Sequence, residues 1–340
     1  MLGTKSIVLL GVFYLLLVTT FSSLSYIVTY IYDHKEGYEF VGPLILATNY
    51  GTFLITNLFA PSIRLPYKTQ MKIAAICYTF NYVTQSIPAS KALNIFFIVI
   101  GSMVSGFGAA ILWVVYGAYI KSLCKVHEEE EEEGKYFSIA NMLNFSSNLF
   151  GAIITTFGIG LFSNEIYFVI LIVLGLISLL YCHFLVEDIP KLEEKHEEYD
   201  CLKELKGVFS YYPRMKSLFF MMIIDGLSLA FTSTSLPRFI PATSSEQKNN
   251  LEAGICLMIF GVGTIIGGYL SGYIPTKIGV VRGGKLAILM FFICCGYTFY
   301  PINSPSLVSG FIGGFLWGVE LYYLEGWLLV ACSHFFNGDL

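Results

Sequence analysis

Hydrophobic residues along this chain of 340 residues gather into ten long runs, which shorter polar segments separate. A helix that crosses a bilayer needs about 20 apolar residues. The runs cover residues 6–32, 39–60, 70–88, 92–121, 137–162, 166–186, 217–240, 252–274, 285–301 and 305–333. The pattern predicts an all-α, polytopic transmembrane protein with ten helices. The first run is long enough to span and has no convincing cleavage site, so we expect it to remain as an anchor.

The fourth run carries small residues at a spacing of four positions. The pairs are Gly101 with Ser105, Ser102 with Gly106, and Gly106 with Ala110. This spacing lets a second helix approach closely. In lipid the hydrophobic effect does not drive helices together, so close van der Waals contact has to stabilise their association. Trp113 and Tyr116 follow near the end of the run, where amphipathic rings favour a membrane interface or the mouth of a cavity. The run therefore predicts a helix that packs against other helices.

Composition supports a membrane protein and argues against a soluble domain, a nucleic-acid-binding protein and a metal-binding protein. Apolar residues make up 55% of the chain and charged residues 13%, whereas a soluble domain carries about 25% charged residues. The net charge of −4 sits in the loops and gives no indication of nucleic-acid binding. The eight cysteines form no CxxC pair or Cys/His cluster, so we expect free thiols and no metal site.

The loop charges predict the orientation. With the N-terminus in the cytosol, sixteen of the 20 lysines and arginines fall on the inner side. Four fall outside, namely Lys35, Lys91, Arg238 and Lys248. Positive charge is expected on the cytoplasmic side. The alternation supports both the helix count and a location of both termini on that side.

Two loops stand out. Glu128–Glu133 is an unbroken acidic tract, which we interpret as a solvated loop in preference to a cation-binding or partner-docking tract. Residues 186–216 form the longest loop, and its apolar residues recur at near-helical spacing, which predicts an amphipathic helix on the inner surface. The predicted organisation is a six-helix half over residues 1–186, a cytoplasmic linker over 187–216 and a four-helix half over 217–340.

Six helices, a long inner loop and a further group of helices form the architecture of a major facilitator transporter. A basic inner loop lies between the second and third helices of each half. The two loops read PSIRLPYKTQMK and GYIPTKIGVVRGGK. Their matching positions favour two related halves.

Five segments resemble the uncoordinated-93 family of major-facilitator-like proteins. They are NLFAPSI (57–63), the stretch 78–82, GFGAAILWVVYGAYI (106–120), GKYFSIANMLNFSSNLFGAIIT (134–155) and GGFLWGVELYYLEGW (313–327). Trp113, Gly117 and Tyr119 match the residues that the family usually has at these positions, while Tyr116 stands where a glutamine is usual. In the tenth run, Glu320-Leu321 and Leu324-Glu325-Gly326 replace the family's usual Gly-Asp and Asn-Thr-Gln.

The resemblance implies a twelve-helix fold, of which ten helices are present and the last two are absent. Either the chain is truncated or those two helices were never present. The family implies a role as an accessory of potassium channels, as a trafficking partner of membrane receptors, or as a transporter.

Three acidic residues lie inside the predicted membrane-spanning runs. They are Asp225, Glu320 and Glu325. A charged side chain in the bilayer is energetically costly, so such a residue usually has a function. The resemblance implies that their helices line a central cavity, where such acids could exchange protons or hold a cation. The alternative is that each is hydrogen-bonded to a neighbour or lies close to water, which we prefer for Glu325. Glu320 and Glu325 are about 140° apart around a helix, so both cannot face one centre.

Other runs carry candidate polar surfaces. Asn141, Asn144 and Asn148 share one helix face, and we favour hydrogen bonds between helices over a solute site. Ser22 and Tyr26 offer hydroxyls that could line a wet cavity, together with Trp113 and Tyr116. The eighth run has a stripe of glycines that indicates close packing. These are Gly254, Gly261, Gly268 and Gly272.

The sequence contains no catalytic motif, so we expect neither an enzyme nor a bound cofactor. The first functional hypothesis is an accessory or regulatory membrane subunit, with the lipid bilayer and a membrane protein as its partners. The second is a proton- or cation-linked transporter of a small solute.

Overall fold

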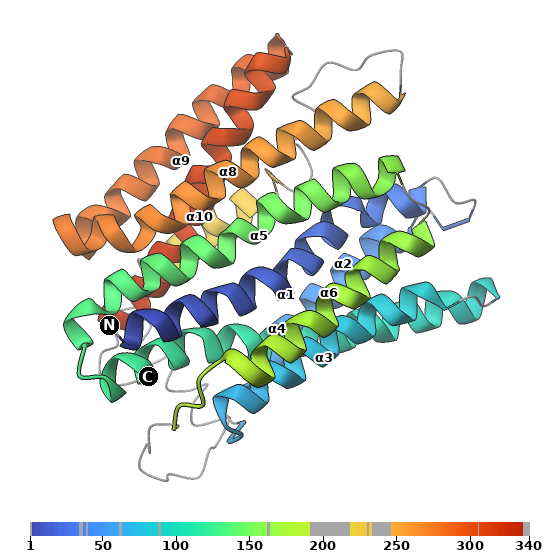
Figure 1. Cartoon of the computed structure of the whole chain (residues 1–340). Coiled ribbons are helices and arrows are strands. Elements are labelled where there is room, and N and C mark those ends of the chain that lie inside the picture. The colour runs from blue at the N-terminus through green and yellow to red at the C-terminus, as the bar shows by residue number, and fades with distance from the viewer. Residues whose placement is uncertain are drawn as a thin grey trace. The chain divides into compact units, whose positions relative to one another are not determined.

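The computed structural model describes residues 2–33, 37–38, 40–60, 63–87, 90–161, 164–190, 218–229, 231–232, 246–304 and 306–335. Its regular elements in these ranges are helices, which confirms the all-α prediction (Figure 1). They are α1 (Leu2–Asp33), α2 (Val41–Asn57), α3 (Tyr67–Ser86), α4 (Lys91–Val126), α5 (Glu133–Leu161), α6 (Asn164–Leu185), α8 (Glu246–Ile278), α9 (Val280–Asn303) and α10 (Leu307–Phe335). A further helix, Leu218–Leu229, precedes α8.

Seven of the described helices are long and apolar enough to cross a bilayer, as expected of an integral multi-pass membrane protein. They lie in α1, α4, α5, α6, α8, α9 and α10. α2 has 17 residues and is shorter than a typical span. α3 has 20 residues but contains threonine, asparagine and glutamine, so its composition is more polar.

The chain forms two compact units. The first comprises Met1–Glu130 and Phe157–Lys206, and the second comprises Glu131–Thr156 and Gly207–Leu340. Most of α5 therefore packs in the second unit. The linker predicted to hold an amphipathic helix falls largely at residues 191–217, outside the described residues, so that helix and the domain boundaries predicted from the sequence stay predictions.

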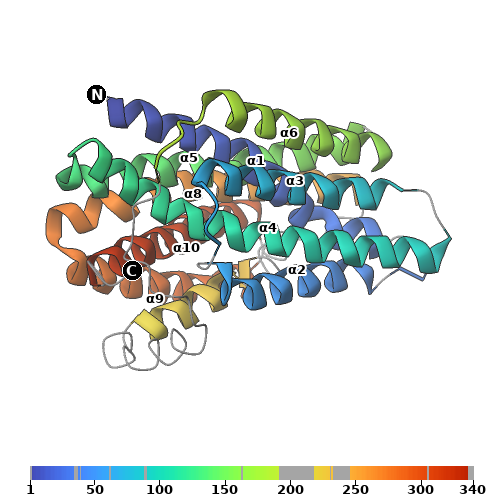
Figure 2. The same ribbon diagram turned by 90° about the horizontal axis from the view of Figure 1, so that it is seen from below.

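The small residues of α4 lie at its contacts within the first unit. A Cβ atom added to Gly108 would lie 2.5 Å from the Cys77 Cβ in α3. A Cβ atom added to Gly106 would collide with the backbone carbonyl of Asn49 in α2. α4 therefore lies close to both α2 and α3 (Figure 2), which confirms the packing that its small residues predicted.

Hydroxyl groups connect α1 to three other helices of this unit. Tyr14 donates a hydrogen bond of 2.6 Å to the Leu112 carbonyl of α4. Thr20 and Tyr82 of α3 share a hydrogen bond of 2.7 Å, and Ser23 and Tyr167 of α6 share another of 2.7 Å. Buried hydroxyl groups are usually paired in this way, since an unpaired one is costly in an apolar interior.

The substitution Tyr14→Phe tests the contribution of one such bond. We expect it to lower the free energy of unfolding by about 1 kcal/mol, because a buried hydrogen bond is lost while the ring remains. Tyr300→Phe is the matched control, since that tyrosine is 61% exposed. Thermal unfolding of both variants in one detergent measures the effect. Equal melting temperatures would contradict the prediction.

In the second unit, α8 contacts α5 along one face and α10 along another. A Cβ atom added to Gly261 would lie 2.5 Å from the Leu149 Cα in α5, and one added to Gly268 would lie 2.5 Å from the Phe145 ring. Gly254 and Gly272 also face residues of α5. The glycine stripe of α8 is therefore a packing surface, as the sequence predicted.

Candidate functional site

Glu320 lies in the middle of α10, and none of its surface is exposed. Two apolar clusters surround this part of the helix. The first consists of Cys256, Phe260, Cys294, Trp317 and Leu321. The second consists of Leu218, Met221, Ile224, Ala287, Tyr323, Leu324, Trp327, Leu328 and Ala331. Glu320 follows a member of the first cluster and precedes members of the second, so a carboxyl group lies where two apolar cores meet.

Aromatic residues fix α10 against α9 on both sides of this acid. Trp317 Nε1 donates a hydrogen bond of 3.0 Å to Thr298 Oγ1. Tyr323 donates one of 3.1 Å to the Gly283 carbonyl, and Trp327 Nε1 donates one of 2.9 Å to the Val280 carbonyl. The polar atoms of these three side chains are all paired. The position of Glu320 is thus set by well-satisfied neighbours.

Glu320 itself differs from those neighbours. Neither of its carboxyl oxygens has a hydrogen-bond partner of normal geometry among the described residues. The Ser228 side chain lies beside the carboxyl, and its hydroxyl oxygen also lacks such a partner. A buried polar group without a partner is costly. Three unpaired oxygen atoms therefore lie together in an apolar interior.

Asp225 belongs to the same group. It lies one turn before Ser228 on the helix Leu218–Leu229, and its charge is close enough to act on Glu320. Its side chain is half-buried, and its Oδ1 atom has no partner among the described residues. The thiols of Cys294 and Cys295 approach Glu320 from α9. The structure thus brings Asp225 and Glu320 together, and Asp225 also lies near Glu325, the third acid singled out in the sequence.

Glu325 occupies a different position from Glu320. It is half-buried, whereas Glu320 is fully buried, and the group near it is Asp225. The two glutamates thus differ in their surroundings.

Ser228 is the member of the site that the sequence analysis missed. A signal was present, because Asp225, Ser228 and Thr232 follow one another at spacings of three and four residues. Such a spacing places side chains on one face of a helix. Ser228 and Thr232 are both buried. The polar stripe of this helix could therefore have been found beside the stripe of α5.

The three asparagines of α5 have different surroundings. Asn141 donates a hydrogen bond of 3.3 Å to Ser271 of α8, as expected of a bond between helices. Asn148 donates one of 3.3 Å to the Phe145 carbonyl of its own helix. Both polar atoms of the Asn144 amide lack a partner among the described residues. Although the three asparagines lie on one face of α5, they do not share a hydrogen-bond partner.

Two of the candidate cavity residues of the first unit, Trp113 and Tyr116, lie in an aromatic cluster. Tyr116 is fully buried, and its ring centroid is 4.7 Å from that of Tyr14 and 5.9 Å from that of Trp113. Ser22 is buried as well. The side chain of Tyr26 lies outside the described part of the chain. A role of these residues in lining a cavity stays a prediction.

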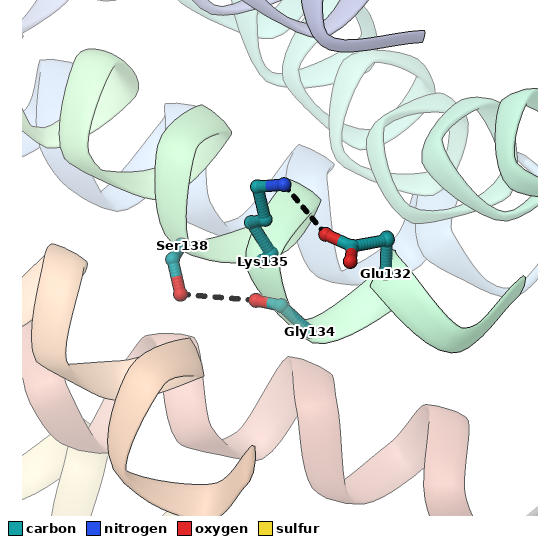
Figure 3. A network of polar contacts seen from close by, with 4 residues as sticks. All are labelled: Glu132, Gly134, Lys135 and Ser138. Atoms are coloured by element: carbon teal, nitrogen blue, oxygen red, sulfur yellow. Dashed lines mark hydrogen bonds and ion pairs between the residues drawn. The ribbon is translucent and has the colours of Figure 1, made fainter. Parts of the chain in front are cut away.

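The acidic tract ends in the first turn of α5. Glu130–Glu132 form a short 3₁₀ turn, and Lys135 Nζ lies 2.6 Å from Glu132 Oε2 (Figure 3). Both side chains of this ion pair are well exposed, so it adds little stability. Ser138 donates a hydrogen bond of 2.9 Å to the Gly134 carbonyl one turn away. No group of three metal-ligating residues that could hold a metal ion occurs in the described ranges.

Comparison with known proteins gives both a family and a fold. A family model described as "Ion channel regulatory protein UNC-93" matches residues 33–307. The solved structure of the nucleoside transporter NupG has a TM-score of 0.68 at 12% identity, covering 98% of this chain and 83% of that chain. A D-xylose-proton symporter has a TM-score of 0.55 at 14% identity, covering 98% and 85%. No curated protein matches. These likenesses confirm the major facilitator fold.

Proposed function

Because this chain belongs to the UNC-93 family of ion channel regulatory proteins, we propose that it is a non-enzymatic subunit that binds an ion channel within the membrane. The observation that supports this proposal is the family match, which spans residues 33–307 and so includes helices of both units. The resemblance seen in the sequence names potassium channels as one partner class. The buried acid site gives such a subunit a means of responding to its surroundings.

Co-expression with individual potassium channels in oocytes tests this proposal. We expect the current of at least one channel to change in amplitude or voltage dependence, and that channel to co-purify with the chain in a mild detergent. A point-mutant channel that no longer co-purifies should lose the change in current. The proposal fails if no channel of the panel responds and the purified chain carries out transport alone.

We propose that both termini face the cytosol, because sixteen of the 20 basic residues then lie on the inner side. Epitope tags at residue 1 and after residue 340 should be protected in intact cells and stained after permeabilisation. A tag inserted in the loop between α3 and α4 should be stained in intact cells and serves as the control. Staining of either terminal tag without permeabilisation would contradict this orientation.

A second candidate function is proton- or cation-linked transport of a small solute. The observation that favours it is the burial of Glu320 beside Asp225, since intramembrane acids commonly mark ion pathways. Purified chain in liposomes filled with a pH-sensitive dye provides the assay, with mixed nucleosides and D-xylose as first probes. Solute-dependent acidification that is lost in Glu320→Gln would support transport. Equal signals in wild type and variant would contradict it.

A further inference from the structure

The site around Glu320 holds several polar atoms that lack a partner among the described residues. In the same unit, the polar atoms of Trp317, Tyr323 and Trp327 have partners, and the Cys256 thiol donates to the Gly310 carbonyl at 3.5 Å. Two buried groups of α5 in this unit also lack a partner among the described residues, namely the Asn144 amide and the Ser147 hydroxyl. The unpaired oxygens of Glu320, Ser228 and Asp225 differ from these because they lie together and include two carboxyl groups, and such a cluster points to a function.

We propose that Glu320 binds a single exchangeable proton, that Ser228 holds the carboxyl in both of its protonation states, and that Asp225 relays the proton to and from water. The proposal concerns the protonation of the isolated chain. It is therefore independent of the channel partner and of solute transport.

The chemistry of the site fits a proton better than a metal cation. Ca²⁺ takes six to eight oxygen ligands and Mg²⁺ takes six. Glu320 and the groups around it offer two carboxyls and one hydroxyl, beside two thiols and apolar side chains. Thr298 Oγ1 is already engaged with Trp317. A proton needs one oxygen atom and one hydrogen-bond partner, which this set supplies.

Ser228 suits the role of a partner in both states. A hydroxyl can donate a hydrogen bond and can also accept one. It donates to Glu320 when that group is a carboxylate, and it accepts from Glu320 when the group is a carboxylic acid. Rotation of the O–H bond about the serine Cβ–Oγ bond is enough to change between the two hydrogen bonds, so neither side chain has to leave its buried position.

Asp225 suits the relay because it lies near the buried acid and is itself partly exposed. It is half-buried, whereas Glu320 and Ser228 have no exposed surface. In the relay, the protonated Asp225 carboxyl loses its O–H bond as the Glu320 carboxylate gains one. The Asp225 carboxylate then takes the next proton from a hydronium ion, which leaves as water. Each step transfers one proton and conserves charge.

Other titratable groups around Glu320 are few in the described part of the unit. Cys294 and Cys295 approach from α9, Cys256 belongs to the adjoining cluster, and Glu325 lies near Asp225. The basic residues of this unit whose side chains are described lie near helix ends rather than beside the acid. They are Lys135 at the start of α5, Lys277 at the end of α8, and Arg282 and Lys285 at the start of α9.

Infrared difference spectroscopy of the full chain in lipid nanodiscs tests the proposal. The protonated carboxyl band of a buried acid should disappear when the pH is raised and return when it is lowered. Glu320→Gln should lose this band. Glu165→Gln, which removes an exposed acid at the start of α6, should keep it. Glu320→Asp retains the acid, so a shifted band in that variant identifies the group even if the glutamine variant folds poorly.

Two further variants separate the roles of the neighbours. Ser228→Ala should shift the midpoint of the titration and the frequency of the band, because the hydroxyl partner is lost. Asp225→Asn should keep the band but slow its hydrogen–deuterium exchange, because the relay is lost. The proposal is overturned if the band persists in Glu320→Gln, or if it responds to sodium or potassium at constant pH. An unchanged midpoint in Ser228→Ala would remove the role of the hydroxyl.

Discussion

Replacing Gly318 by leucine is expected to prevent the second unit from folding, at a cost of about 4 kcal/mol or more. Gly318 of α10 faces α8, where an added Cβ atom would collide with the Phe260 carbonyl and lie 3.1 Å from the Gly263 Cα. The colliding atoms belong to a helix backbone, which cannot rotate away as a side chain can. The leucine side chain would therefore force α8 and α10 apart.

Gly296→Leu is the matched control for this substitution. That glycine lies in α9, and an added Cβ atom would meet nothing within 4 Å. Size-exclusion chromatography of both variants in one detergent measures the effect as the yield of monodisperse protein. We expect wild-type yield from Gly296→Leu and aggregate from Gly318→Leu. Monodisperse Gly318→Leu protein with a wild-type melting temperature would contradict this packing.

Glu320→Met is expected to stabilise the protein by about 2 kcal/mol. Methionine has nearly the same shape as glutamate and places no unpaired oxygen between the two apolar clusters. Since functional sites commonly reduce stability, a gain in melting temperature together with loss of the infrared band would show that the acid is kept for its chemistry. Glu165→Met, at an exposed acid, should leave the melting temperature almost unchanged. A lower melting temperature for Glu320→Met would mean that the hydrogen bond proposed between the carboxyl and Ser228 stabilises the protein by more than burial of the carboxyl costs.

The helices could be predicted from the sequence because hydrophobic length is a direct requirement of the bilayer. The run 92–121 corresponds to α4, which extends to Val126. The run 252–274 corresponds to α8, which begins at Glu246 and ends at Ile278. Helix ends extend into polar residues because backbone hydrogen bonding continues beyond the apolar stretch. Hydropathy therefore predicts that a helix is present more reliably than it predicts where the helix begins and ends.

The candidate site could be predicted only in part. Asp225 and Glu320 were found because charge within the membrane is rare. Ser228 was not, since serine is common in membrane helices and becomes informative only through its spacing from Asp225 and Thr232. Which groups meet depends on the rotation of each helix about its axis, and packing against neighbouring helices fixes that rotation. For the same reason, the spacing of Asn141, Asn144 and Asn148 could not predict which of them bonds to another helix.

The glycines on two faces of α8 also bear on motion. Interlocking side chains resist the sliding of one helix along another, and glycine surfaces lack such side chains. Gly261 and Gly268 present a smooth face to α5, while Gly263 and Gly267 present another to α10. Shear displacement, in which packed helices slide by small amounts, should therefore meet least resistance along α8. A change at the acid of α10 could be passed to α5 by this route, with the hydrogen bond between Asn141 and Ser271 limiting how far the two helices slide.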